Sequence, residues 1–467
     1  MIQFQKRKNP KDLSVRARIT DSGLDIFVNK DRFPVRYPRE IWNRYPQKAK
    51  VVLSDNITCS ATMFVPQIFN IFNVHYATAR PLAEAFFFQN GMHDMSISAL
   101  VDAKPASEYI KRFLGTQRSF AKNSVQTVQL TGGPRTTNAV VIPFSFGKES
   151  MLTVALAQEL GLRPILVNFI EPSNTYEYTH KKALIKRFEK QFGLTIYTVY
   201  NGPGLLRSGY LWDKKTALGW GLQTTEYALL SLPFVYSFGA QYLALGNEKS
   251  CDDTFLDAQG VLTFKAGYDQ HSDWTPQQGL LASLMLGRKI DVFSLMEPLY
   301  EFGITAILHG RYPFHGSYQM SCMADTASAK EKRWCQNCTK CGYIFALVSG
   351  CQLDTRKLGF TKNLFARPNM HIYNDFFNSQ KGQVLSYGSR EELGLAFLYA
   401  ARMGISGAGI DYFRKNLLRE FERNEQVYAH QFLGINTFRN IPKKFVPTLT
   451  AIYKEELKKF CISTSKS

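Results

Sequence analysis

From residue 139 onward, short apolar runs alternate with stretches in which apolar residues recur at helical spacing. The apolar runs cover residues 139–144, 163–170, 194–199 and 241–246, and the helical stretches cover 148–160, 177–192 and 223–238. A run that is apolar throughout indicates a strand buried on both faces, which is typical of a parallel sheet covered by helices. We therefore predict an α/β domain with right-handed crossovers and a ligand site at the carboxyl ends of its strands.

The chain has a different pattern on either side of this segment. The preceding region carries short β-like runs among prolines and charged residues, at 24–29, 50–53 and 63–68, and then a helical stretch at 79–88. The following region is dominated by helical periodicity, most clearly at 393–401 and 413–421. We predict four units: a β-rich α+β N-terminal region at 1–135, a parallel-sheet domain at 136–320, a cysteine-rich segment at 321–358 and a helical C-terminal region at 359–467.

The composition narrows the class of protein. Of the 467 residues, 45% are apolar and 20% are charged, which excludes general disorder, collagen and coiled coil. A formal charge of +19 favours polyanions such as nucleic acid, nucleotides, phosphorylated metabolites or an acidic membrane surface, and a solvated basic surface is the alternative. The N-terminus lacks the apolar segment of a signal peptide, and polar residues, glycine and proline interrupt the uncharged run at 227–247. We expect a cytoplasmic protein without a membrane span.

The first candidate site is the loop between the strand at 139–144 and the helix that follows it. Such a loop presents backbone N–H groups and a helix dipole to phosphate oxygens. Gly147 allows close backbone approach, Lys148 adds a positive charge, and the hydroxyls of Ser145 and Ser150 can donate hydrogen bonds. Glu149 is a candidate to hold Mg²⁺. The alternative is an ordinary strand-to-helix turn.

This loop resembles the pyrophosphatase loop of the PP-loop ATPases, whose usual pattern is Ser-Gly-Gly-x-Asp-Ser. Ser145, Gly147 and Ser150 match that pattern, whereas Phe146 replaces a glycine and Glu149 replaces the aspartate. The resemblance implies a HUP-like parallel-sheet fold and an enzyme that cleaves ATP to AMP and pyrophosphate while it adenylates a substrate. It also implies an adenine site at the ends of the first two strands, where Asn168 is the candidate by position.

A cysteine cluster is the most specific chemical signal in the chain. Cys322, Cys335, Cys338 and Cys341 supply four thiolates with spacings of 12, 2 and 2 residues. Four cysteine ligands in two short spacings are typical of structural zinc, which they hold as a tetrahedron. The alternative is a set of free or redox-active cysteines. The cluster also resembles the zinc knuckle of cyano-deazaguanine synthase.

Polar residues follow the last apolar run. Asn247 and Glu248 come directly after it and are candidates for nucleotide binding, and Cys251, Asp252 and Asp253 come next. Residues 268–274, YDQHSDW, add His271. Such polar density beyond a buried strand suits a loop that lines a substrate site, and a solvated loop is the alternative.

The order of these motifs resembles one branch of the PP-loop enzymes more closely than the others. GKES, GNEKS, YDQHS, FSLMEPLYEFGI, SC and WCQNCTKC follow one another much as in the ATP-dependent UDP-N-acetylmuramoyl-L-alanyl-L-glutamate epimerases. The resemblance covers about residues 140–350. The chain departs from the branch at positions 146 and 149 and in YDQHSDW, where the basic residue of the branch is missing.

These observations lead to one main functional hypothesis and two alternatives. We expect an enzyme that uses ATP, Mg²⁺ and Zn²⁺ and adenylates a carboxylate, in the epimerase version that of a terminal L-glutamate. Lys148 and Glu149 would act on the phosphates, and Asp252, Asp253 and His271 are the candidate acids and bases. The first alternative is an enzyme that modifies nucleobases or tRNA, with tRNA or another polyanion as partner. The second is a nucleic-acid-binding protein whose ATPase domain no longer works.

Overall fold

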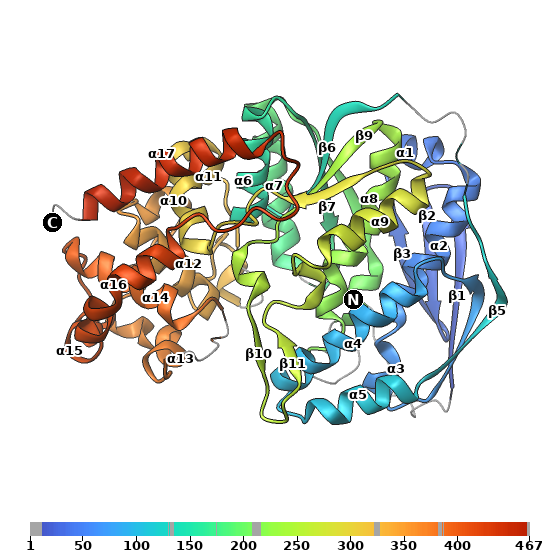
Figure 1. Cartoon of the computed structure of the whole chain (residues 1–467), viewed down its shortest axis with the longest axis horizontal. Coiled ribbons are helices and arrows are strands. Elements are labelled where there is room, and N and C mark those ends of the chain that lie inside the picture. Colours follow the sequence, from blue (N-terminus) through green and yellow to red (C-terminus); the bar gives the residue numbers. More distant parts are fainter. Residues whose placement is uncertain are drawn as a thin grey trace.

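A computed structural model of the chain describes residues 12–128, 130, 135–173, 175–207, 216–321, 327–381, 385 and 387–464. Its centre is one ten-stranded sheet with the strand order β12-β9-β6-β7-β8-β3-β2-β1-β4-β5 (Figure 1). Helices cover both faces of the central strands, so the chain is an α/β protein as predicted.

Five parallel strands form one half of the sheet: β6 (Thr137–Pro143), β7 (Arg163–Ile170), β8 (Ile196–Asn201), β9 (Ala240–Leu245) and β12 (Asp291–Ser294). Their order places β6, the first in the chain, between β7 and β9. From β6, the chain first adds β7 and β8 on one side and then β9 and β12 on the other. This reversal creates a topological switch point beside β6, the usual position of a ligand in a doubly wound sheet. The predicted parallel sheet is confirmed.

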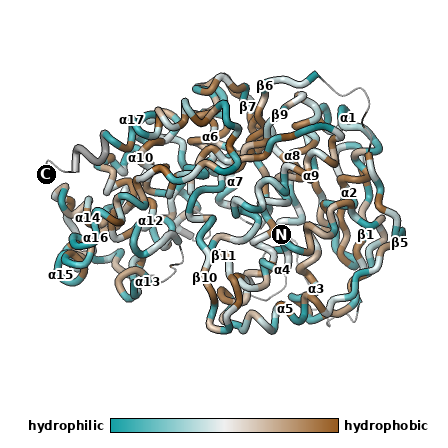
Figure 2. The backbone as a smooth tube through the Cα atoms, in the orientation of Figure 1, coloured by the Kyte–Doolittle hydropathy of each residue, from teal (hydrophilic) through white to brown (hydrophobic). Residues whose placement is uncertain are grey.

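Successive residues of a strand point to opposite faces, and β6 accordingly contributes to two hydrophobic cores. Val140 and Ile142 pack in the core beneath α6 (Lys148–Glu159), α7 (Thr175–Phe192) and α10 (Glu301–Arg311). Ala139 and Val141 pack in the other core, beneath α8 (Gln223–Ser237) and α9 (Thr275–Leu286). Hydrophobic residues are concentrated on these central strands in Figure 2.

The N-terminal strands continue the same sheet: β1 (Asp12–Thr20), β2 (Gly23–Val28), β3 (Asp31–Arg36), β4 (Asn73–Arg80) and β5 (Gln117–Val125). The connection to the central strands is an antiparallel pairing of β3 with β8. Three antiparallel steps, from β8 through β3 and β2 to β1, reverse the strand direction. Strands β1, β4 and β5 are parallel to one another, so their carboxyl ends lie at the edge of the sheet opposite to those of β6–β9.

Two N-terminal strand predictions are wrong. Residues 50–53 lie in α2 (Gln47–Thr62), and residues 63–68 lie mostly in α3 (Val65–Phe69). Periodicity alone does not distinguish a short apolar run in a strand from one in a buried helix. The predicted helix at 79–88 is displaced, because β4 extends to Arg80 and α4 (Glu84–Val101) begins after it. Two further helices complete this part of the chain: α1 (Arg39–Arg44) and α5 (Ala106–Gly115).

The C-terminal part is helical, as predicted, and lies beside α6 and α10 at the left of Figure 1. Its helices are α11 (Pro313–Gly316), α12 (Thr339–Gly350), α13 (Asn374–Phe377), α14 (Arg390–Arg402), α15 (Ala408–Asn416), α16 (Leu418–Phe432) and α17 (Val446–Thr464). Their apolar faces extend the core on the α6 face of the sheet. A hairpin of β10 (Thr254–Leu256) and β11 (Leu262–Phe264) stands apart from the main sheet.

Within the described residues, no helix is long and apolar enough to cross a membrane. The uncharged run at 227–247 contributes to α8 and to β9 instead. The division into four units stays a prediction, although one core joins residues from both 1–135 and 136–320.

Candidate functional site

The loop after β6 lies at the switch point of the sheet. Gly147 is the N-cap of α6, and having no side chain it leaves the first N–H groups of that helix without a side-chain cap. Ser145 and Ser150 shape the loop: Gly147 N donates to Ser145 Oγ at 3.2 Å, and Ser145 N donates to Ser150 Oγ at 3.3 Å. The strand, loop and helix therefore form the arrangement that binds phosphate in other doubly wound sheets.

Phe146 explains how the loop keeps its shape without the first glycine of the PP-loop pattern. Its φ of 63° lies in the left-handed region, which favours glycine. Its side chain is fully buried, and its ring centroid lies 4.6 Å from that of Phe144 and 6.0 Å from that of Phe188. Burial of this ring offsets the unfavourable backbone conformation, which typically costs about 1–3 kcal/mol.

Lys148 is buried at the start of α6 and is enclosed by acids. It forms ion pairs with Glu149 and with Glu301, whose Oε2 lies 2.5 Å from Lys148 Nζ. Burial opposes the charge on Lys148, but the two carboxylates outweigh it and raise the pKa. For Glu149, burial is likewise outweighed by the Lys148 ammonium, and the pKa falls. The side chain of Lys148 is thus charged and held in place beside the loop.

Two further buried glutamates complete an acidic cluster around Lys148. Glu248 accepts hydrogen bonds from the backbone and hydroxyl of Ser250, and burial together with the charges of Glu301 and Glu392 raises its pKa well above the usual range. Glu392 accepts from Phe302 N at 2.7 Å and from Tyr343 OH at 2.9 Å. Burial and Glu301 raise the pKa of Glu392 to about 7. The cluster therefore holds protons near neutral pH, or takes up a cation.

The loops after β6 and β9 meet at this cluster. A Cβ on Gly246 would lie 3.1 Å from Glu149 Cβ, so a side chain there would push the two loops apart. Asn247 Nδ2, just beyond Gly246, is buried without a hydrogen-bond partner in the described part of the chain. Asn168 lies within β7 and donates to Phe144 O at 2.7 Å, and its Oδ1 is likewise buried and unpaired among the described residues. One buried donor and one buried acceptor thus flank β6.

The candidate acids and bases separate into two groups. Asp252 is held by Lys249 Nζ at 3.0 Å and by Ser272 N at 2.9 Å, and these bonds outweigh burial and lower its pKa. His271 lies beside it, with Nε2 3.8 Å from Asp252 Oδ1. Asp253 points elsewhere, toward Tyr300 OH at 3.4 Å. Burial raises the pKa of Asp253, so this carboxylate is the better proton acceptor of the two.

The described cysteines of the cluster converge. The Sγ atoms of Cys335, Cys338 and Cys341 all lie within 4.8 Å of one another, and Cys338 caps α12. This group could hold a metal ion such as zinc. Cys322, the predicted fourth ligand, lies outside the described residues. Lys340, between two of the cysteines, lies close enough to lower the pKa of Glu149, so this segment adjoins the phosphate loop.

Several charged residues near the carboxyl ends of the central strands were not predicted. Glu301 and Glu392 belong to the acidic cluster, and the available signal was that two glutamates accompany each of the largely apolar segments FSLMEPLYEFGI and EELGLAFLYAA. Glu171 follows β7 and forms an ion pair with Arg207, which pairs with Glu226 on the other side. Arg207 and Glu226 are buried and Glu171 is half-buried, and the triad ties β7 to α8. No short motif marks it.

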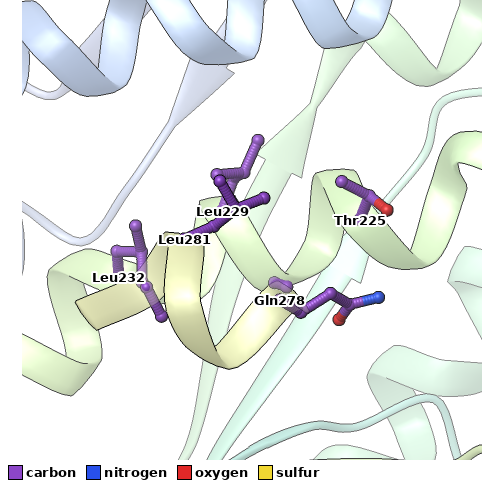
Figure 3. Close-up of a pocket in the computed structure, with 7 residues that line it drawn as sticks. Thr225, Leu229, Leu232, Gln278 and Leu281 are labelled. Carbon is purple, nitrogen blue, oxygen red and sulfur yellow. The ribbon is translucent and has the colours of Figure 1, made fainter. Parts of the chain in front are cut away.

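A small cavity lies between α8 and α9, where Figure 3 shows Leu229, Leu232 and Leu281 beside Gln278 and Thr225. Its volume is about 10 Å³, which is close to the minimum for a single water molecule. Gln278 donates to Asp269 O at 2.9 Å and spans the polar end of this cavity. The cavity is too small for a substrate.

Comparison with protein-family models and with curated proteins finds no match to this chain. Its function is therefore inferred from the residues gathered at the switch point.

Proposed function

We propose that the chain is an ATP-dependent enzyme that forms AMP and pyrophosphate and adenylates a substrate carboxylate. The observation that carries this proposal is the uncapped N-terminus of α6 at the switch point, beside a buried lysine and four glutamates. The motifs of the chain resemble those of the PP-loop enzymes, and this resemblance supports phosphate binding by the loop after β6. The substrate we propose is a small molecule that ends in a carboxylate, such as the terminal L-glutamate of a UDP-muramyl peptide.

Each residue of the loop has a role in this proposal. The N–H groups at the start of α6 bind phosphate oxygens, and Gly147 leaves room for their approach. Lys148 offsets negative charge on the phosphates, and Asn168 and Asn247 offer an acceptor and a donor on either side of β6. Glu149, Glu248 and Glu301 would hold Mg²⁺ through carboxylate oxygens, which are the ligands that this ion prefers. Bound Mg²⁺ would neutralise charge that develops on the phosphates during transfer.

In the epimerase version of the proposal, the acyl-adenylate makes the neighbouring α-proton more acidic. Asp253 is the base we propose for its removal, because burial raises its pKa toward the range useful for proton transfer. Asp252 and His271, which lie beside each other, are candidates to return a proton, after which water would release AMP from the acyl group. The cysteine group is proposed to bind structural zinc.

The test is production of AMP and pyrophosphate from ATP and Mg²⁺, with UDP-N-acetylmuramoyl-L-alanyl-L-glutamate as the probe substrate. Glu248→Gln keeps the size of the side chain but removes its ability to carry negative charge, and we expect at least a tenfold loss of rate. Glu422→Gln, on the exposed side of α16, is the matched control and should retain the full rate. Equal rates for both variants would refute the assignment of the acidic cluster.

The charge of +19 favours a second candidate, an enzyme that modifies tRNA or a nucleobase with the same ATP chemistry. In this case ATP cleavage would depend on added tRNA rather than on the UDP-linked peptide. A chain that cleaves no ATP with either would instead support a nucleic-acid-binding protein.

A further inference from the structure

A second cleft lies at the opposite edge of the sheet, at the carboxyl ends of β1, β4 and β5. Its volume is about 250 Å³, just below the range of ligand pockets for drug-sized molecules. Helix α2 forms one wall and the three strands form the other. The lining residues are Ala17, Ile19, Val51, Ser54, Asp55, Ala77, Thr78, Ala79, Ala121, Lys122 and Gln126.

The cleft exists because the side chains of three adjacent strands become smaller along the strand direction. Val15, Tyr76 and Phe120 are register partners and form a buried row across the strands, with the two rings stacked at 5.0 Å. Beyond this row, toward the carboxyl ends, the face that packs against α2 carries small side chains, among them Ala17 on β1 and Ala79 on β4. The bulky row fills the space under the far end of α2, whereas the alanines leave space under the part of α2 that contains Asp55.

Two polar side chains inside the cleft are buried and available to a ligand. Asp55 and Thr78 are each only 7% exposed. Thr78 Oγ1 has no hydrogen-bond partner among the described residues. Asp55 accepts a hydrogen bond from the backbone of Ala79. Among the described residues, no Lys, Arg or His nitrogen forms an ion pair with Asp55. A buried carboxylate without a counter-ion is costly, and a cationic ligand group would remove much of this cost.

Lys122 contributes the opposite charge. It lies on β5, is exposed, and lines the same cleft as Asp55, whose pKa its charge lowers in part. The cleft therefore presents an anion inside and a cation at its mouth, with a hydroxyl and an amide from Thr78 and Gln126 between small apolar residues. This pattern is complementary to a zwitterion with a short aliphatic body.

We propose that this cleft binds a free amino acid or a molecule of similar size, with its ammonium group on Asp55 and its carboxylate on Lys122. The Thr78 hydroxyl would form a hydrogen bond with the polar end of the ligand, either as donor or as acceptor. This inference does not rest on the proposed ATP chemistry, since the two sites lie at opposite edges of the sheet.

The test is calorimetric titration of the full chain with L-leucine, L-glutamate and L-lysine. Each is compared with its N-acetyl form, which lacks the ammonium group, and with its amide, which lacks the α-carboxylate. At least one free amino acid should bind, and its N-acetyl form should bind at least tenfold more weakly. Equal binding of both forms, or no binding of any free amino acid at millimolar concentration, would overturn the proposal.

Variants locate the binding at the cleft. Asp55→Asn keeps the shape of the side chain but removes its charge, so affinity should fall at least tenfold. Asp21→Asn, in the exposed turn between β1 and β2, is the matched control and should bind normally. Ala17→Leu places a larger side chain in the cleft from β1, on the same face as buried Val15, and should also abolish binding. Normal binding by both Asp55→Asn and a folded Ala17→Leu would contradict this assignment.

Discussion

Phe146 shows how a single residue can depart from a motif and still preserve the backbone that the motif specifies. At this position the chain has a left-handed φ of 63°, which is the reason that glycine suits it. The aromatic ring is buried in the core between β6 and α7. The sequence pattern shows that a glycine is missing, but it does not show that burial of the Phe146 ring offsets this loss.

We therefore expect Phe146→Gly to lower stability but to leave the phosphate loop able to bind ATP. Removing the ring leaves a cavity and should lower the free energy of unfolding by about 3–5 kcal/mol, as for other large-to-small core changes. ATP binding per folded molecule should persist, because glycine adopts the same φ readily. Urea denaturation measures the first effect and equilibrium ATP binding the second. A folded variant that has lost ATP binding would show that the ring itself shapes the loop.

Asp55 gives a pH-dependent prediction at the same scale. Burial raises its pKa from 3.8 to about 6, so between these values the unfolded chain loses the proton first and folding stability falls as pH rises. Above about pH 6 the cost of the buried charge is complete and is on the order of 2–3 kcal/mol. Asp55→Asn should therefore be more stable than the wild type at pH 7 and equally stable near pH 3.5. A variant that is less stable at pH 7 would contradict this.

At the scale of elements, the sequence predicts the central strands well because their apolar runs are bounded by clear loops. Arg163–Ile170 is a strand with the predicted bounds, and helices α6 and α8 end within one residue of the predicted positions. The strand predicted at 50–53 is wrong because α2 is buried on most of its surface and has no strong amphipathic pattern, whereas the run at 24–29 forms β2 as predicted. A four-residue apolar run inside such a helix looks the same as a short buried strand.

The cysteine group gives a testable prediction about zinc binding at the scale of elements. Cys335→Ser should lower the zinc content of purified protein and its thermal stability together, because the free energy of metal binding is partly free energy of folding. Cys351→Ser is the matched control: this thiol is buried outside the group and should leave the zinc content unchanged. Elemental analysis of protein prepared without chelators measures both. A wild type without zinc would refute the metal site.

At the scale of the whole molecule, the sequence could not predict which distant residues meet. The phosphate loop, Glu248 and the cysteines were predicted from local patterns, but Glu301 and Glu392 reach the same cluster only through the packing of α10 and α14. The pairing of β3 with β8, which joins the N-terminal strands to the central sheet, is equally long-range. Such contacts depend on tertiary packing rather than on local propensity or spacing.

For the whole molecule, the net charge of +19 predicts how binding of polyanions depends on salt. Binding of tRNA by general attraction should weaken steeply between about 50 and 200 mM salt, because each phosphate contact releases counterions. Binding of the UDP-linked peptide should weaken far less over this range, since it engages few phosphates. Filter binding or fluorescence anisotropy measures both. Tight binding of tRNA that persists at the higher salt concentration would favour the tRNA-modifying candidate.

The products formed from ATP by a pair of glycine variants test the proposed ATP chemistry at the phosphate loop. A Cβ at Gly147 would lie 3.0 Å from Glu149 Oε2 and 3.1 Å from Ser145 Oγ, so Gly147→Val should block phosphate approach. A Cβ at Gly115, at the end of α5, would lie no closer than 3.9 Å to a neighbouring atom, so Gly115→Val is the control. We expect AMP and pyrophosphate from the wild type and from Gly115→Val, and the loss of both products in Gly147→Val. ADP and phosphate as products, or full activity of Gly147→Val, would contradict it.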